Sequence, residues 1–195
     1  MADQDVATEE EQEEHEERLD PEVVARRQAA LHFVRQWGDP VLKSTARPVD
    51  RFDDDLRTQI EQMGQIMQDA LGIGLAATQV GKLHRVLVYR VEPDSPVNAV
   101  VNPVIEWSGS ELDTVEEGCL SLQGVLVDVE RPVHVRVRAQ DEHGAPITIE
   151  ASGLEARVLQ HEIDHLDGVL ILDRASRDQR KAALRALREA AEQAA

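Results

Sequence analysis

Residues 161–165, His-Glu-Ile-Asp-His, have the side chains to bind a metal ion and to carry out hydrolysis beside it. Histidines four residues apart lie on one face of a helix, about 6 Å from each other, close enough to share a cation. The H-E-x-x-H pattern on a helix is typical of zinc peptidases, with the glutamate as general base. A metzincin would continue to a third histidine, but Ile171 stands at that position. A third ligand must therefore come from elsewhere in the chain.

The segment around this pattern carries the signals of a helix of about four turns. Ser152 followed by Glu155 predicts a capping box at the start, and Gly168 predicts the end. One face repeats at helical spacing: Leu154, Val158, His161 and His165. We therefore expect both histidines to point inward, and two buried imidazoles need a polar partner, which favours a metal site over a chance match.

Two residues are candidates for the third ligand. Glu189 would complete a thermolysin-like zinc peptidase, although the residues around it are typical of a solvated helix face. Cys119 is the only cysteine of the chain and follows Gly118, which lets backbone come close, and a thiolate binds transition metals strongly. Glu162 is rotated by about 100° from its histidine neighbour, so it can act on a water at the metal rather than bind the metal.

Three blocks of the chain resemble those of the peptide deformylase family: GIGLAATQ at residues 72–79, EGCLS at 117–121 and QHEIDH at 160–165. They occur in the family's order and at compatible spacing, and the resemblance covers about residues 32–180. One departure is Gln123, where many family members carry a proline, so the loop that lines the substrate groove can differ in shape.

The resemblance implies removal of the formyl group from the N-terminal formylmethionine of nascent polypeptides. Cys119, His161 and His165 would hold one divalent transition metal. Many family members use iron(II), and one thiolate with two imidazoles also suits zinc, nickel and cobalt.

The resemblance also implies roles for the residues around the metal. Glu162 would take a proton from a water that the metal activates and pass it to the leaving amine. The Gln79 side-chain amide and the Leu120 backbone N–H would stabilise the oxyanion. Glu117 and Arg131 are expected to pair and to brace the cysteine loop.

The same resemblance predicts where the peptide binds. Its main chain would pair like an added strand beside the residues Ile73, Gly74 and Gly118. The methionine side chain would enter an apolar pocket formed by Leu154, Val158 and the aliphatic stem of Arg157. These pocket residues could equally belong to the core.

The remaining elements predict an α+β domain, with antiparallel sheets packed around a central metal-binding helix. Asp53–Asp55 opens a helix that ends before Gly72. Strands are predicted at residues 85–91, 98–101, 132–139 and 147–151, with a break at Asn102-Pro103 and a hairpin turn at 141–144. Residues 31–195 would form the catalytic domain, including a C-terminal helix at 176–195.

Residues 1–30 are predicted to be an acidic, mostly disordered tail that can become helical near residues 21–30. Its first 20 residues hold ten carboxylates and one arginine, about half of the net charge of -17. This acidity argues against DNA binding, and no apolar run is long enough to span a membrane. The acidic start is neither a secretory signal nor a transit peptide, so we expect a cytoplasmic protein.

The predicted C-terminal helix carries a basic stripe: Arg177, Arg180, Lys181, Arg185 and Arg188. Such a stripe is often only a solvated face, but in this family it could also dock on ribosomal RNA. A non-enzymatic alternative is an inactive, ribosome-bound relative that keeps the fold. The intact Gln79, Cys119 and Glu162 argue against that alternative.

We predict that Cys119→Ser abolishes metal binding, because serine removes the thiolate ligand. Elemental analysis of the purified variant measures this directly. A peptidase that used Glu189 as third ligand would keep its metal in the same experiment.

Overall fold

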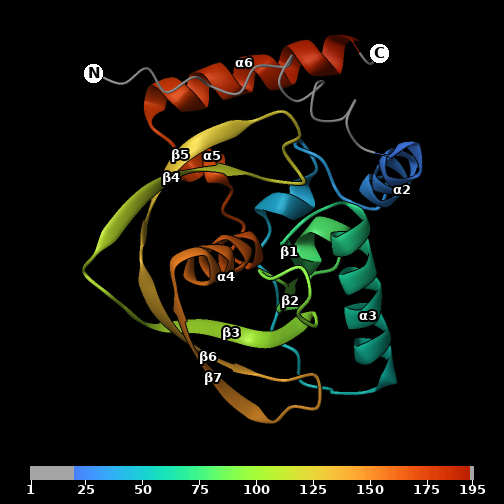
Figure 1. Cartoon of the computed structure of the whole chain (residues 1–195), viewed down its shortest axis with the longest axis vertical. Helices are drawn as coiled ribbons and strands as arrows, with labels where there is room; N and C mark the ends of the chain where they lie inside the picture. The colour runs from blue at the N-terminus through green and yellow to red at the C-terminus, as the bar shows by residue number, and fades with distance from the viewer. Residues whose placement is uncertain (1–19, 194–195) are drawn as a thin grey trace.

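Helices and antiparallel strands follow one another without regular βαβ alternation, which confirms the predicted α+β class. The computed structural model describes residues 20–193 (Figure 1). In chain order its elements are α2 Pro21–Leu31, η1 Pro40–Lys43, α3 Asp54–Asp69, β1 Gly74–Ala76, η2 Ala77–Val80, β2 Val86–Tyr89, β3 Asn98–Ser108, β4 Leu112–Gly118, β5 Leu126–Pro132, β6 His134–Gln140, β7 Pro146–Ser152, α4 Gly153–Leu166, α5 Ile171–Arg174 and α6 Arg177–Gln193.

Two antiparallel sheets enclose the helix α4. The larger sheet has the strand order β1-β2-β3-β6-β7, and β4 pairs with β5 in a second, two-stranded sheet. Figure 1 shows α4 between these sheets, and its residues Ala156, Leu159 and Leu166 are buried in the main core cluster. The short strand β1 lies at one edge of the larger sheet, and β2 is its only partner among the described strands. The predicted arrangement of sheets around a central helix is confirmed.

The helix α4 begins and ends where the sequence predicts, but the prediction of a capping box is wrong. Ser152 is the N-cap residue, yet its side chain makes no capping hydrogen bond. Glu155 instead accepts a hydrogen bond from Tyr89 Oη at 2.8 Å, because packing against β2 offers it a tertiary partner. Gly168 follows the C-cap with a φ of 75°, a left-handed conformation that glycine adopts without strain.

The predicted break at Asn102-Pro103 is a bulge inside one long strand, β3. The register to β6 shifts between Val101 and Val104. Asn102 has a φ of 54°, and its side chain bonds the backbone N–H and C=O of Val49 and the side chain of Gln140. These long-range bonds hold the irregular residue in place, so the strand continues beyond it.

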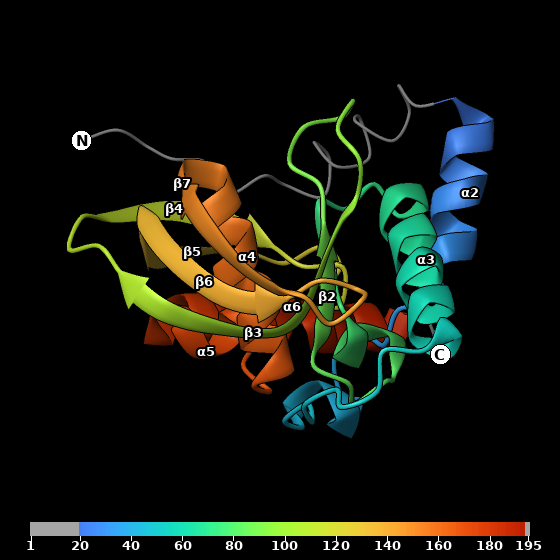
Figure 2. The same ribbon diagram turned by 90° about the horizontal axis from the view of Figure 1, so that it is seen from below.

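Helices α2 and α3 lie side by side, as Figure 2 shows, and α3 contacts β1 and β2. Asp53 caps α3 by accepting a hydrogen bond from the Leu56 N–H at 3.1 Å, as its acidic start predicts. The helix expected near residues 21–30 is α2, and its Ala30 and Leu31 are buried in the cluster that also holds the apolar face of α3. Residues 1–19, for which disorder is predicted, lie outside the described residues, and the domain division at residue 30 stays a prediction.

The helix α6 runs across the two-stranded sheet β4–β5 (Figure 1). Ala183 is buried against this sheet in a cluster that includes Val127 and Ile171. Ile171 is therefore an ordinary core residue, as its place after the metal-binding helix predicts. No helix in residues 20–193 has the length and apolar character needed to cross a membrane.

Candidate metal centre and peptide groove

Three side chains with metal-binding atoms meet between α4 and the turn that follows β4. Cys119 comes directly after β4, and His161 and His165 lie one turn apart on α4. The ligand atoms of these three residues all lie within 4.8 Å of one another. Cys119 Sγ is 3.2 Å from His165 Nε2, and the two Nε2 atoms are 3.2 Å apart. The fold thus brings together the three ligands that the family resemblance implies.

The distances and charges at this cluster suit a divalent cation. Two nitrogen ligands of a tetrahedral ion, with bonds of roughly 2.0–2.1 Å, lie about 3.4 Å apart, close to the observed separation. Burial and the neighbouring His161 lower the pKa of His165 well below its usual value, which keeps that ring neutral. Burial would also lower the pKa of His161, but hydrogen bonds with Cys119 and Glu117 raise it to about 10. The surroundings of His161 therefore favour a positive charge, whether that of a proton or of a metal ion.

Glu117 orients His161 from the side away from the other ligands. His161 Nδ1 lies 2.9 Å from Glu117 Oε2, so Nδ1–H donates to the carboxylate and leaves the Nε2 lone pair for a ligand. Arg131 donates to both oxygens of Glu117, at 2.7 and 3.0 Å, and Arg157 adds a third bond of 2.7 Å. Burial would raise the pKa of Glu117, but the hydrogen bonds from His161 and Arg131 bring it down to about 2. The predicted pairing of Glu117 with Arg131 is confirmed.

Arg131 also ties β5 to the metal-binding helix. Its Nη1 donates to Asp164 Oδ2 at 2.8 Å, and Arg174 of α5 donates to the same oxygen at 3.0 Å. The side chains of Arg131 and Glu117 are only 4% and 6% exposed. The sequence did not single out Asp164, because the H-E-x-x-H spacing marks the metal-binding side of the helix, and Asp164 bonds the arginines instead.

Glu162 lies beside the ligands with its carboxyl group buried. Its Oε2 atom has no hydrogen-bond partner within residues 20–193. Burial raises the pKa of Glu162 from 4.5 to about 7. A Cβ at position 74 would come within 3.0 Å of this carboxyl group, so Gly74 is required for the close approach. A carboxyl group with a pKa near neutrality can both accept and return a proton.

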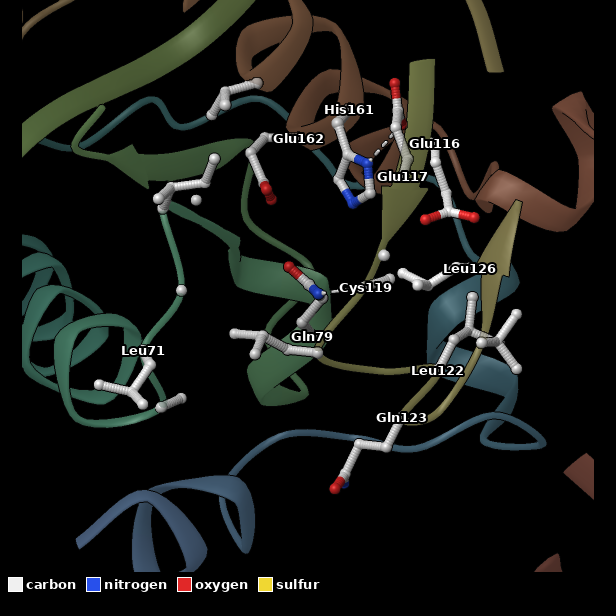
Figure 3. Close-up of a pocket in the computed structure, with 18 of the residues that line it drawn as sticks. Leu71, Gln79, Glu116, Glu117, Cys119, Leu122, Gln123, Leu126, His161 and Glu162 are labelled. Atoms are coloured by element: carbon white, nitrogen blue, oxygen red, sulfur yellow. Dashed lines mark hydrogen bonds and ion pairs between the residues drawn. The ribbon is translucent and has the colours of Figure 1, made fainter. Parts of the chain in front are cut away.

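Gln79 and the loop after Cys119 are held in fixed positions close to the ligands. Gln79 Oε1 accepts a hydrogen bond from the Ala76 N–H at 2.8 Å, which turns its NH₂ group towards Ser121 Oγ at 3.3 Å and Cys119 Sγ at 3.6 Å. Gln36 Nε2 lies 3.2 Å from the carbonyl oxygen of Leu120. Figure 3 shows Gln79, His161 and Glu162 around one shared space.

This space opens into a groove of about 820 Å³. Cys119, His161, Glu162 and Gln79 lie at its inner end, and all six predicted substrate-binding residues line it: Ile73, Gly74, Gly118, Leu154, Arg157 and Val158. The expected inward orientation is wrong for Leu154, which is 54% exposed because it lies on the first turn of α4, at the groove. Val158, one turn later, is buried.

The groove also has lining residues that the sequence analysis missed, among them Arg27, Leu71, Val115 and Leu126. They come from α2, from the end of α3 and from the strands β4 and β5. No common spacing links these segments in the sequence, so only the tertiary structure brings the four side chains together.

Glu189 is not a ligand. It lies on α6, is 55% exposed and pairs with Arg185 at 2.8 Å. Within residues 20–193 the only group of three ligating side chains is the one at Cys119. The zinc peptidase alternative with Glu189 as third ligand is therefore wrong.

Comparison with known proteins decides the family. Residues 31–181 match the family model described as polypeptide deformylase. The chain belongs to the polypeptide deformylase family. These deformylases are enzymes that hydrolyse the N-formyl group from the N-terminal methionine of polypeptides.

Individual deformylases are similar along most of their length. The peptide deformylase of Parafrankia sp. (strain EAN1pec) is 45% identical over 161 residues, which are 83% of this chain and 87% of the relative. The crystal structure of a peptide deformylase from Synechococcus elongatus in complex with actinonin has a TM-score of 0.75 and 45% identity, covering 77% of this chain and 84% of that one. The crystal structure of a peptide deformylase from Legionella pneumophila has a TM-score of 0.77 and 39% identity, and the match covers 82% of this chain and 94% of that one.

We predict that Arg131→Ala lowers metal content and deformylase activity together. The substitution leaves Glu117 as a buried carboxylate without its two-bond partner, and breaking such a pair typically costs about 3–5 kcal/mol. Elemental analysis, thermal unfolding and a formyl-peptide assay measure the three consequences.

The control for this prediction is Arg136→Ala on β6, which breaks an exposed ion pair with Glu150 of β7 and should change none of the three quantities. Arg131→Lys should have a metal content, stability and activity between those of wild type and those of Arg131→Ala, because lysine keeps the charge but loses the two-bond geometry. Full metal content and full activity in Arg131→Ala would show that the bracing is unnecessary.

Proposed function

We propose that this chain removes the formyl group of N-terminal formylmethionine through a water activated by a metal, with Glu162 as general base and then general acid. The observation that carries this proposal is the buried Oε2 of Glu162, which has no hydrogen-bond partner within residues 20–193 and lies beside the cluster of Cys119, His161 and His165. A buried carboxylate oxygen needs a polar partner, and a water at the metal would supply one.

Cys119, His161 and His165 would hold one divalent transition metal. We propose iron(II) in the cell, since a thiolate with two imidazoles suits it, and zinc, nickel or cobalt would fit the same donors. When bound, the metal would lower the pKa of a water molecule and polarise a carbonyl oxygen.

The proton transfer falls to Glu162. With a pKa of about 7, its carboxyl group can take the water's proton at neutral pH. The same proton would then pass to the methionine nitrogen as the C–N bond to the formyl carbon breaks. The nearby Gly74 keeps this carboxyl group in contact with the groove.

The charge that develops on the formyl oxygen would be stabilised by two donors. One is the Gln79 Nε2 amide, whose orientation is fixed because the Oε1 atom accepts the Ala76 N–H. The other is the Leu120 backbone N–H. Removing one donor of an oxyanion hole typically lowers the rate by about 10²–10³.

The peptide would lie between two strand edges. Among the strands within residues 20–193, β1 has β2 as its only partner and β4 has β5 as its only partner. Ile73 and Gly74 line the groove from one edge and Gly118 from the other. Main-chain pairing with these edges would accept many sequences. The methionine side chain would contact Leu154, Val158 and the stem of Arg157, whose guanidinium is held by Glu117.

We predict that Glu162→Gln keeps its metal but loses at least about 100-fold in kcat, the usual effect of removing a general base. The assay uses a formyl-Met-Ala peptide after anaerobic purification, with elemental analysis of the same sample. Glu130→Gln, an exposed position on β5, is the control and should behave as wild type.

Two results would contradict this proposal. A metal-loaded Glu162→Gln variant with wild-type kcat would remove Glu162 from the reaction. A wild-type protein with full metal content and no activity on the peptide would favour the inactive relative. We keep the prediction of a cytoplasmic location, where nascent polypeptides are made.

We also propose that α6 docks on ribosomal RNA through its basic side chains. Lys181 and Arg188 are exposed on α6, whereas Ala183 on the same helix is buried against β5. Phosphate contacts of this kind are weakened by salt. The basic stripe alone would also suit a solvated face, so the proposal depends on the binding measurement.

We predict that Lys181→Glu with Arg188→Glu weakens cosedimentation with ribosomes and reduces its salt dependence. Point changes are preferable to deletion of residues 176–195, because deletion would expose the surface that Ala183 covers. Arg136→Glu with Arg138→Glu on β6 is the control with the same change of charge. Equal binding by both double variants would refute a specific role for α6.

A further inference from the structure

The helix α2 supplies part of the groove, and it precedes most of the residues that match the family model. The family match begins at residue 31, whereas α2 spans Pro21–Leu31. Its Arg27 lines the groove together with Leu71 and Gln123. Figure 3 shows Leu71 and Gln123 at the end remote from His161, with α2 beyond them. The helix α2 thus adds an arginine to the outer end of the groove.

The position of Arg27 is fixed by the packing of α2. The neighbouring Arg26 pairs with Asp69 of α3 at 3.3 Å, and Ala30 and Leu31 are buried in the core. These contacts set the rotation of α2 about its axis. Arg27, turned by about 100° from Arg26, is half-buried at the groove.

The two arginines that line the groove within residues 20–193 are Arg27 and Arg157. The guanidinium of Arg157 donates hydrogen bonds to Glu117 and to the carbonyl oxygens of Val129 and Asp113. It therefore stabilises the wall of the groove. Arg27 has five N–H donors and can bind a ligand carboxylate while it keeps another contact. The exposed Gln123 amide adds donors at the same end of the groove.

We propose that Arg27, with Gln123, forms a subsite for a carboxylate of the peptide downstream of the formylmethionine. The carboxylate is an acidic side chain or the C-terminal carboxyl group of a short peptide. This inference rests on the proposed function, because it assumes a peptide that runs outward from the metal centre. The subsite makes this chain prefer acidic peptides among the many sequences that main-chain pairing accepts.

The length of the groove indicates which peptide residue reaches Arg27. Leu71 precedes Gly74 by three residues, at most about 10 Å of extended chain. Leu71 has a φ of 60° and lies outside β1, so the path is shorter than this limit, and an extended peptide covers it in two or three residues. With the methionine beside Gly74, the second or third residue after it lies beside Leu71, at the level of Arg27.

The test compares peptides that differ in charge alone. Formyl-Met-Ala-Asp-amide and formyl-Met-Ala-Ala-Asp-amide are compared with their Asn and Lys counterparts by kcat/KM. Formyl-Met-Ala-Ala with a free carboxyl group is compared with its amide, which separates a side-chain from a terminal carboxylate. For wild type we expect a roughly two- to fivefold preference for the carboxylate, the range of one partly exposed ion pair.

The variants assign the preference to Arg27. The Asp-to-Asn ratio should fall to about one in Arg27→Ala, invert in Arg27→Glu and persist in part in Arg27→Lys. Arg35→Ala, which removes an exposed arginine outside the groove, should keep the wild-type ratio. High salt should reduce the wild-type ratio but leave the ratio of Arg27→Ala unchanged.

The inference is overturned if wild type shows no preference for a carboxylate, or if Arg27→Ala retains the preference. Activity on neutral formyl-Met-Ala-amide tests the proposed function separately. In the Glu162→Gln protein the dissociation constants of the Asp and Asn peptides can be compared without turnover. Their ratio tests independently of catalysis whether Arg27 carries the preference for a carboxylate.

Discussion

The buried ion pair between Glu117 and Arg131 is the interaction on which the rest of this structure depends. Glu117 comes from β4, Arg131 from β5, and both reach α4, Glu117 through His161 and Arg131 through Asp164. One carboxylate thus positions His161 in the candidate metal centre and fixes the strand that leads to Cys119. Because both charges are buried, the pair is stable only when its geometry is complete, so the metal centre and the small sheet are held as one unit.

The groove follows from the way the two sheets end around α4. The larger sheet stops at the short strand β1, and the smaller one presents β4, so two strand edges face the same space. Because Gly74 has no Cβ, the Glu162 carboxyl group can approach this space, and its burial raises the pKa of Glu162. Access to the groove and the raised pKa of Glu162 therefore have a common cause.

Much of the fold was readable from local patterns. The helices α3 and α4 and the β6–β7 hairpin were predicted well, because each has its own periodicity and turn or cap residues. The strands β4 and β5 were not predicted, and the other errors lie where distant residues override a local signal. Tyr89 donates a hydrogen bond to the Glu155 carboxylate, which a capping box would otherwise use. The hydrogen bonds of Asn102 to Val49 and Gln140 allow β3 to continue through a residue at which the sequence predicts a break.

The sequence by itself determined the residue types of the centre: two histidines and a glutamate on one capped helix, and a single cysteine within a recognisable block. Helical spacing and the small number of candidate ligands were sufficient for that. Only the tertiary structure excluded Glu189 as a metal ligand and placed Asp164 in hydrogen bonds with Arg131 and Arg174. It also placed Arg27 at the groove. Those outcomes depend on how helices and sheets pack, and contacts between residues far apart in the chain leave no periodic trace in the sequence.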